Sequence, residues 1–421
     1  MENEIKDTAA FSPEAAQSVP VEAPGRKLSD SDVMQHTANI WRYRTVIEDG
    51  TELHTEYHSK YARECGCEVI AARARGKKHK HEGSNCDDWF ETGSAGGCVI
   101  AVVADGAGSK PLSRIGARVS CEAAVDFLKE KLSGLMESDP ELKRQLSAEM
   151  GGQEFMTACG IMAPIIRDSA KAAYDAVAKK RSALENDPVY IRALGRNPVV
   201  GDLSATFLAA VAVPLETDGG RQTFVMSVQI GDGCICAIDS RSDSGSCLRL
   251  LGEADSGAYS GETEFLSAKT VSDAVIAGKT RISRGKSDIL MLMSDGVADD
   301  YFPAQPMMKR LYLDLCLNGI LPQEGESAQP QPPAPVKYPS VSLEQREVTL
   351  QYAKQLLHDG SDGEVNALWE RRRELKPHSL EAYGISLGKQ PQERLMNWLD
   401  NYNERGSFDD RTLVVLRLNA E

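Results

Sequence analysis

The order of predicted elements along the chain favours an α+β fold, in which sheets pack against each other and helices lie outside them. Predicted strands come first, two helical stretches follow, strands then return, and one last strand lies at the C-terminus. A doubly wound α/β fold would alternate strands with helices instead. With 421 residues, of which 41% are hydrophobic, the chain is long enough to bury a sizeable core.

The strands are predicted from two patterns of apolar residues. Short segments of alternating character cover 41–46 and 68–74. Nearly unbroken apolar runs predict the remaining strands, at 98–104, 204–213, 223–230, 234–239, 288–295 and 411–418. The polar stretch "GKKHKHEGSN", at 76–85, is predicted to be a loop.

Two helices are predicted between these groups of strands, at about 113–133 and about 165–185. In the first helix, one face carries Ala117, Cys121, Ala124, Val125, Leu128 and Leu132. In the second, one face carries Ile166, Ala170, Ala173 and Val177. Each helix therefore has an apolar face to bury.

The chain is predicted to form one domain at 41–421, preceded by a disordered extension at 1–40 that is rich in Pro, Ala, Ser and Glu. Within the domain, "QPQPPAPVKYP" at 329–339 is typical of a proline-rich linker. The stretch "SLEQ" at 342–345 resembles a capping box that opens a helix. Because the last strand follows this region, we interpret about 303–405 as a helical insertion rather than a separate C-terminal domain.

The net charge of −14 argues against a nucleic-acid binder, whose footprint would be a basic patch, and suits a protein that gathers metal cations. The N-terminal residues lack the basic start and apolar run of a signal peptide, and no stretch approaches the ~20 apolar residues of a membrane span. We therefore expect a cytoplasmic protein whose ten cysteines are thiols. The spacing of His54, His58, Cys65 and Cys67 leaves a zinc site open as an alternative.

Carboxylates recur at the ends of predicted strands that are far apart in the sequence. The corners are Asp87-Asp88, Asp105-Gly106, Asp295-Gly296 and Asp409-Asp410. A single Asp-Gly pair is a frequent turn, but this recurrence exceeds what turns alone require. Grouped carboxylates without cations would repel and raise each other's pKa values. The pattern therefore predicts hard divalent cations, with Mg²⁺ or Mn²⁺ matching an all-oxygen ligand set.

These corners resemble the motifs of the metal-dependent type 2C Ser/Thr protein phosphatases, in a bacterial-type member. "DGAG" resembles the family's Asp-Gly-x-Gly, "SDG" its later Ser-Asp-Gly, and "DDRT" its Asp-Asp-x-Thr. "SNCDDWF" resembles the opening Asn-x-Asp, "DLSATFLAAVAV" the Gly-Thr-Thr strand, and "VQIGDGCICAID" the Val-Gly-Asp-Ser hairpin. The motifs occur in family order from about residue 68 to 419. The resemblance implies a four-layer α-β-β-α sandwich, with two central, mostly antiparallel sheets flanked by helices.

The resemblance also assigns metal ligands to individual residues. It implies that Asp105 bridges two metal ions and that the Gly106 carbonyl ligates one of them. Asp295 and Asp409 would complete the protein ligands of the other ion. Asp105, Asp295 and Asp409 would then be catalytic through metal-bound water.

Other acids receive less definite roles from the same resemblance. Asp87 matches the N-terminal metal acid, and Asp88 beside it remains open as the alternative. Asp202 matches the acid that some bacterial members carry at a third, weaker metal site. Asp232 and Asp410 are expected to be structural.

The chain departs from the family at the substrate phosphate. Many members carry an arginine there, whereas this chain has Glu82 at the corresponding position. "GKKH" resembles the Gly-x-Ser-His of a bacterial subgroup, which favours His79 as the phosphate-binding residue, and Arg75 is a second candidate. Two alternatives remain open. The basic loop could be solvated without binding the phosphate, or the phosphate could be bound by another cation of the loop, namely Lys77, Lys78, Lys80 or His81. Ala107 stands where some eukaryotic members have a histidine that protonates the leaving group, so another group would have to do so.

The function implied is hydrolysis of phosphoserine or phosphothreonine on a protein, by attack of a hydroxide that bridges two Mn²⁺ or Mg²⁺ ions. The expected partner is a phosphorylated protein, opposing a Ser/Thr kinase, with no nucleic acid or membrane. Two alternatives stay open: a non-catalytic phosphoprotein-binding or regulatory member of this fold, and an unrelated carboxylate-metal hydrolase of small phosphoesters. The insertion at about 303–405 would select substrates or dock a partner, or else cover one side of the sheets.

Overall fold

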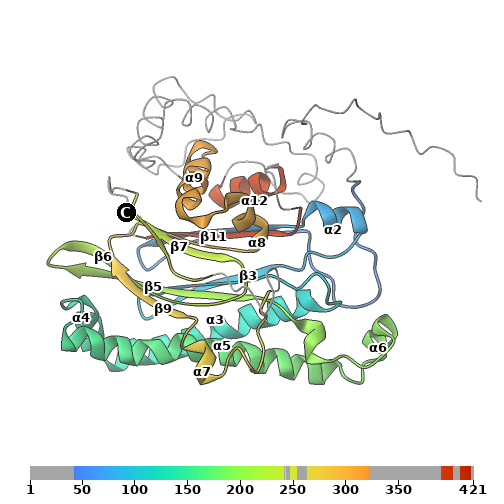
Figure 1. The fold of residues 1–421 in the computed structure, drawn as a ribbon, viewed down its shortest axis with the longest axis horizontal. Helices are drawn as coiled ribbons and strands as arrows, with labels where there is room; N and C mark the ends of the chain where they lie inside the picture. Colours follow the sequence, from blue (N-terminus) through green and yellow to red (C-terminus); the bar gives the residue numbers. More distant parts are fainter. Residues whose placement is uncertain are drawn as a thin grey trace, which may run out of the picture. The chain divides into compact units, whose positions relative to one another are not determined.

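Two antiparallel sheets form the centre of the fold, and helices cover their outer faces (Figure 1). The computed structural model describes residues 42–240, 242, 247–253, 263–321, 390–401 and 408–418. They belong to one compact unit. The arrangement is the α-β-β-α sandwich that the sequence predicts.

The first sheet has six strands in the order β1-β2-β11-β10-β7-β8. Their bounds are β1 Tyr57–Glu64, β2 Cys67–Ala74, β11 Arg411–Arg417, β10 Ile289–Met293, β7 Cys234–Ile238 and β8 Leu248–Leu250. The last strand of the chain, β11, thus lies between β2 and β10, so that both ends of the domain share this sheet.

The second sheet has five strands in the order β3-β4-β5-β6-β9. Their bounds are β3 Trp89–Ala95, β4 Cys98–Ala104, β5 Phe207–Thr217, β6 Gly220–Ile230 and β9 Thr280–Gly285. The strand β4 is buried along its whole length, because Val99, Ala101 and Val103 face the other sheet while Ile100 and Val102 face the helices. Its unbroken apolar run follows from burial on both faces.

Two long helices, α3 (Ser113–Ser138) and α5 (Gln153–Leu184), cover the second sheet. They agree with the two predicted helices, except that α3 continues further at its C-terminal end and α5 begins earlier than predicted. Shorter helices join them, namely α4 Glu141–Ser147, α6 Pro188–Leu194, α7 Asp273–Ile276 and the 3₁₀ helix η1 Val200–Leu203. Among the helices of the described ranges, none has the length and hydropathy of a membrane-spanning segment.

The outer face of the first sheet is covered by α9 (Ala304–Leu317) and α12 (Pro391–Asn401). Figure 1 shows them on the side of the sheets opposite to α3 and α5. Both helices bury apolar side chains in one cluster with the sheet, and Trp398 is almost completely buried there. The described ends of the predicted insertion at about 303–405 are thus helical and cover one side of the sheets, which is one of the two alternatives given for it. The predicted linker, the capping box and the N-terminal extension lie outside the described residues.

The structure corrects the prediction for two N-terminal segments. Residues 42–46 form no strand, since Arg44 instead donates a backbone hydrogen bond to the carbonyl of Lys80. The predicted loop 76–85 contains a short helix, α2 (Lys77–Glu82). This helix ends at Gly83, which adopts the left-handed conformation that favours glycine. Strands β1, β3, β8 and β9 were not predicted.

Candidate active site

The acidic corners reach one end of each sheet because of the strand register. Met293, the last residue of β10, pairs with Cys234 of β7 and with Leu413 of β11. The turn after β10 therefore lies beside the segments that lead into β7 and β11. In the second sheet, Trp89 at the start of β3 pairs with Ala104 at the end of β4. The corners before β3 and after β4 are neighbours in the same way.

Asp88 joins the acidic ends of the two sheets. Its Oδ2 accepts hydrogen bonds from the hydroxyl of Ser294, at 2.8 Å, and from the hydroxyl of Thr412, at 2.6 Å. Its Oδ1 is buried without a hydrogen-bond partner. Burial, together with the negative charge of Asp410, raises the pKa of Asp88 to about 7. Asp88 is thus a buried anchor between the sheets.

Asp105, Asp232 and Asp295 form a group whose carboxylate oxygens lie within 4.8 Å of one another. Burial raises the pKa of Asp105 well above its ordinary value, and the charges of Asp295 and Asp88 add to this effect. Burial likewise raises the pKa of Asp295 to about 7. One oxygen of Asp295 is buried without a hydrogen-bond partner. Asp232 was expected to be structural, but the β6–β7 hairpin places it within this group.

The corner at Asp105 is held by backbone hydrogen bonds to the segment before β5. The amide of Asp105 donates to the Thr206 hydroxyl, and the amide of Thr206 donates to the Asp105 carbonyl, both at 2.8 Å. Gly106 allows the Asp87 corner to approach closely, since a Cβ at Gly106 would lie 2.7 Å from the Asp87 carbonyl oxygen and 3.0 Å from its Cβ. Asp87 therefore borders Gly106, whereas Asp88 bonds to the other sheet.

His79 lies against the corner at Asp409-Asp410. Its Nε2 is 3.0 Å from Asp409 Oδ1, and its Nδ1 is 3.4 Å from Asp410 Oδ2 and 2.5 Å from the carbonyl oxygen of Asn85. Burial alone would lower the pKa of His79, but the carboxylates of Asp410, Asp409 and Asp87 raise it to about 10. Burial raises the pKa of Asp409, but His79 more than offsets this and the net shift is downward.

The structure corrects the predicted phosphate-binding roles of Arg75 and His79. Arg75 is 2% exposed, its Nη2 donates to the His79 carbonyl at 2.7 Å, and its Nη1 is 3.8 Å from Glu56 Oε2. His79 is 3% exposed and faces carboxylates. Neither side chain is free to meet a substrate phosphate, because both are buried and bonded to groups of the protein itself.

Lys78, in contrast, is a partly exposed cation at the rim of the site. Its side chain is 42% exposed, and its Nζ lies 4.0 Å from Asp409 Oδ2. A Cβ added to Gly108, in the loop after Asp105, would lie 3.7 Å from the same Nζ. Lys78 therefore lies between the Asp409 corner and the loop that follows Asp105, with a partly exposed side chain.

Asp202 does not join the other acids, which corrects its predicted role at a third metal site. Arg196 donates to both of its carboxylate oxygens, at 2.7 and 2.5 Å, and the amide of Val199 donates at 2.8 Å. The hydrogen bonds from Arg196 lower the pKa of Asp202. A carboxylate engaged in this way has little capacity left for a cation. The alternative zinc site is also unsupported, since no metal-holding group in the described ranges includes a cysteine.

The donors that converge at this end fit hard divalent cations. They are carboxylate oxygens, two of which are buried and unpartnered, on Asp88 and Asp295. Burial, together with the charges of neighbouring acids, raises the pKa values of Asp105 and Asp295, and a bound cation would offset both effects. Oxygen-only ligands match Mg²⁺ or Mn²⁺.

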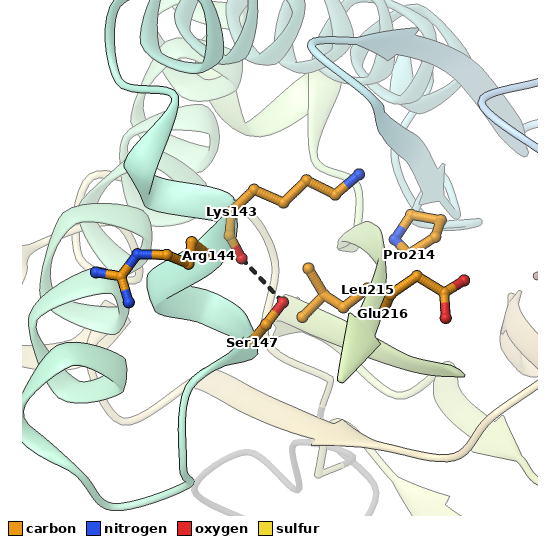
Figure 2. A pocket seen from close by; sticks show the side chains of 6 residues that line it. All are labelled: Lys143, Arg144, Ser147, Pro214, Leu215 and Glu216. Atoms are coloured by element: carbon orange, nitrogen blue, oxygen red, sulfur yellow. Dashed lines mark hydrogen bonds between the residues drawn. The ribbon is translucent and has the colours of Figure 1, made fainter. Parts of the chain in front are cut away.

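A separate surface pocket of about 440 Å³ lies at the C-terminal end of β5, whereas the acidic group lies at its N-terminal end (Figure 2). It is lined by Lys143, Arg144, Ser147, Pro214, Leu215 and Glu216. Figure 2 shows the Ser147 hydroxyl bonded to the Lys143 carbonyl within α4. Because Thr206, at the other end of β5, contacts Asp105, this pocket is distant from the acidic group and is not part of the candidate site.

An α-β-β-α sandwich with carboxylates for divalent cations at one end is the architecture expected of a metal-dependent phosphatase. The sequence profile of protein phosphatase 2C matches residues 75–318, which is more than half of the 421 residues. The chain therefore belongs to the protein phosphatase 2C family, and this membership supports a metal-dependent protein phosphatase.

Solved structures of two phosphatases and of RsbX are similar to this chain at low identity. A bacterial serine phosphatase is 12% identical with a TM-score of 0.36, over 87% of this chain and 99% of that one. The serine/threonine phosphatase Stp1 from Staphylococcus aureus is 12% identical with a TM-score of 0.35, over 89% and 98%. RsbX in complex with magnesium is 12% identical with a TM-score of 0.30, over 86% and 100%. No curated protein sequence matches the chain.

Proposed function

We propose that the protein is a metal-dependent phosphatase that hydrolyses phosphoserine and phosphothreonine in proteins. The observation that carries this proposal is the group formed by Asp105, Asp232 and Asp295, with the Asp409 corner at the same end of the sandwich. Membership of the protein phosphatase 2C family supports the same reaction class. The natural partner would be a phosphorylated protein, and the opposing enzyme a Ser/Thr kinase.

Two Mn²⁺ or Mg²⁺ ions would be held by carboxylates that the fold brings together. Asp105, Asp295 and Asp409, together with the Gly106 carbonyl, would be the residues that hold them. Of the two N-terminal acids, we assign Asp87 to the metal, because it borders Gly106. When bound, two such ions supply a water of lowered pKa as the nucleophile and stabilise charge on the phosphoryl oxygens.

The remaining acids of the corners position these ligands. Asp88 accepts hydrogen bonds from Ser294 and Thr412, the residues that precede Asp295 and follow the Asp409 corner. It therefore fixes the distance between the two sheets at the point where the ligands meet. Asp232 is proposed to extend the carboxylate group, as a ligand or through a bound water, rather than to act as a purely structural residue.

Lys78 is proposed to bind the substrate phosphate. Among the cations that the sequence left open for this role, Lys78 has a partly exposed side chain and lies close to a proposed metal ligand, Asp409. Its ammonium group would pair with a phosphoryl oxygen and offset the negative charge of the substrate as it approaches the acids. Lys78 thereby replaces Arg75 and His79 in this role.

The experiment that tests the proposal is hydrolysis assayed on an aryl phosphate and on a phosphoserine peptide, with metal-stripped protein and added Mn²⁺ or Mg²⁺. We expect no turnover without metal and turnover on both substrates with it. Full activity after exhaustive chelation would exclude the metal-dependent reaction. A nucleotide panel run alongside separates this proposal from a hydrolase of small phosphoesters, which would prefer nucleotides to the peptide.

A further inference from the structure

Helix α2 is docked directly on the acidic corner that precedes β11. A Cβ added to Gly76, just before α2, would lie 2.2 Å from the backbone carbon of Asp409, so only glycine allows this approach. The Gly76 amide donates to Asp410 Oδ1 at 2.6 Å, and the amide of Lys78 donates to the Phe408 carbonyl at 3.0 Å. These contacts fix the first turn of α2 against residues 408–410.

This docking places the His79 ring between two acceptors. Its Nε2 lies 3.0 Å from Asp409 Oδ1, and its Nδ1 lies 2.5 Å from the Asn85 carbonyl oxygen. Asn85 is itself fixed, because its Oδ1 accepts the amide of His54 at 3.0 Å. The ring is buried and held at both nitrogens, whereas the side chain of Asp409 is 42% exposed. A rigid group therefore contacts a carboxylate that borders solvent.

We propose that His79 is a positioning residue that orients Asp409 for the divalent cation and so sets the affinity of the site for metal. The inference rests on the proposed function, because it takes Asp409 as a metal ligand. A partner fixed outside the ligand shell holds a carboxylate in its binding orientation before the cation arrives, and loss of such partners typically costs about 10- to 100-fold in metal affinity. His79 thus acts on the ligand and not on the substrate.

Two substitutions separate the two contacts of the ring. In His79→Gln, the side-chain amide nitrogen can take the place of Nε2 and still donate to Asp409. In His79→Asn, the shorter amide can take the place of Nδ1 and donate to the Asn85 carbonyl, but it does not reach Asp409. The pair keeps polarity and burial nearly matched, so a difference between the two reports on the Asp409 contact.

The measurement is Mn²⁺ binding by isothermal titration calorimetry on the metal-stripped full-length protein, with the melting temperature recorded without metal. We expect His79→Asn to weaken Mn²⁺ binding by about 10-fold or more and His79→Gln to stay within about threefold of the wild type. Inhibition by inorganic phosphate at saturating Mn²⁺ should be the same in all three proteins, since His79 does not contact the substrate.

Equal Mn²⁺ affinity in the wild type and in a folded His79→Asn variant would overturn the inference, as would an equal loss in both variants. If His79→Asn does not fold, His79→Gln decides the question, because a folded Gln variant with strongly weakened Mn²⁺ binding contradicts the role and one with retained binding supports it. Absence of Mn²⁺ binding in the wild type would instead refute the metal site and thus the proposed function.

Discussion

The carboxylate of Asp410 accepts a hydrogen bond from the backbone amide of Asp87, across a sequence separation of 323 residues. Its other oxygen accepts the backbone amide of Gly76 at 2.6 Å. Asp410 is almost completely buried. One side chain therefore ties the segments before α2 and before β3 to the start of β11, and the last acidic corner depends on it.

Replacing Asp410 with asparagine should mainly reduce stability. In asparagine, an NH2 group replaces one of the two carboxylate oxygens, and this group cannot accept a hydrogen bond. The buried backbone N–H of either Gly76 or Asp87 therefore loses its partner. Such an unsatisfied group costs about 1–3 kcal/mol. Urea denaturation of the metal-stripped variant should show this loss, while turnover at saturating Mn²⁺ is reduced but measurable. A variant as stable as the wild type would contradict the anchoring role.

Replacing Asp105 or Asp295 with asparagine should abolish turnover without reducing the stability of the metal-free protein. Each substitution removes charge from a group of buried carboxylates that repel one another, so the metal-free protein should be at least as stable as the wild type. Turnover should be lost, because a neutral amide is a poor ligand for Mn²⁺ or Mg²⁺. Thermal melts with and without Mn²⁺ check both statements, and near wild-type turnover in Asp105→Asn would refute its assignment.

The metal-free protein should lose stability as the pH rises through neutrality. The pKa values of Asp87 and Asp295 are raised to about 7, so below that pH the folded state binds protons that the unfolded chain has already released. Their stabilising contribution is complete below the unfolded pKa, near 3.8, and is lost as the pH rises through about 7. His79, with a pKa raised to about 10, acts in the same direction over a higher range.

Melting temperatures in a chelator should therefore be higher at about pH 5.5 than at about pH 8. Added Mn²⁺ should raise the melting temperature more at the higher pH, where the carboxylates are charged and ready to bind it. The Asp295→Asn variant serves as a control, since it should show a weaker pH dependence. A melting temperature that rises with pH in the chelator would show that these acids are not mutually destabilising.

Much of the fold could be predicted because its central strands are buried on both faces. The apolar runs of β4, β5 and β10 follow from this burial and are bounded by polar or turn-forming residues. The missed strands β1 and β9 are half-exposed along most of their length, so their sequences mix polar and apolar residues without a clear period. Their pairing with neighbouring strands decides their conformation, and a single sequence does not show it.

The site was predicted less completely for a similar reason. The acidic corners stand out as carboxylates at the ends of apolar strands, and this pattern pointed to Asp105 and Asp295, which the fold brings into one group. The roles of Arg75 and His79 depend on partners that only the fold brings near, namely Glu56 and the Asp409 corner. Asp202 was misassigned because nothing in its spacing reveals that Arg196 occupies both of its oxygens.

Replacing Lys78 with alanine should weaken the reaction without weakening metal binding. A hydrogen bond between charged groups is worth about 1.5–3 kcal/mol, so kcat/KM on an aryl phosphate should fall at least about 10-fold. Lys78→Arg should recover much of this loss. Lys77→Ala is the matched control, because Lys77 lies on the same turn but stacks over Phe408, 5.9 Å from its ring. Equal effects of the two alanine substitutions would argue against a contact with the phosphate.

The helical layer over the first sheet determines which deletion the protein tolerates. The guanidinium of Arg394, in α12, donates to the carbonyl of Gly319, just after α9, at 2.8 Å. The described ends at Leu321, after α9, and at Gln390, before α12, are therefore near each other, and a flexible bridge of about eight residues can connect them. Removing only the residues between these ends leaves the layer in place.

We expect this short deletion to fold and to hydrolyse small aryl phosphates at a rate close to that of the full chain, while activity on a phosphoprotein substrate falls. The reason is that the residues at both ends of this segment, 321 and 390, adjoin the helical layer that also contains α8 (Asp295–Ala298). Helix α8 begins at Asp295 of the candidate site. Deleting 304–404 is the contrasting variant, and it should not fold because it exposes the apolar face under α9 and α12. Kinetics on both substrates, with circular dichroism as the folding control, check the prediction. If the short deletion loses activity equally on both substrates, the segment supports the catalytic fold and does not select substrates.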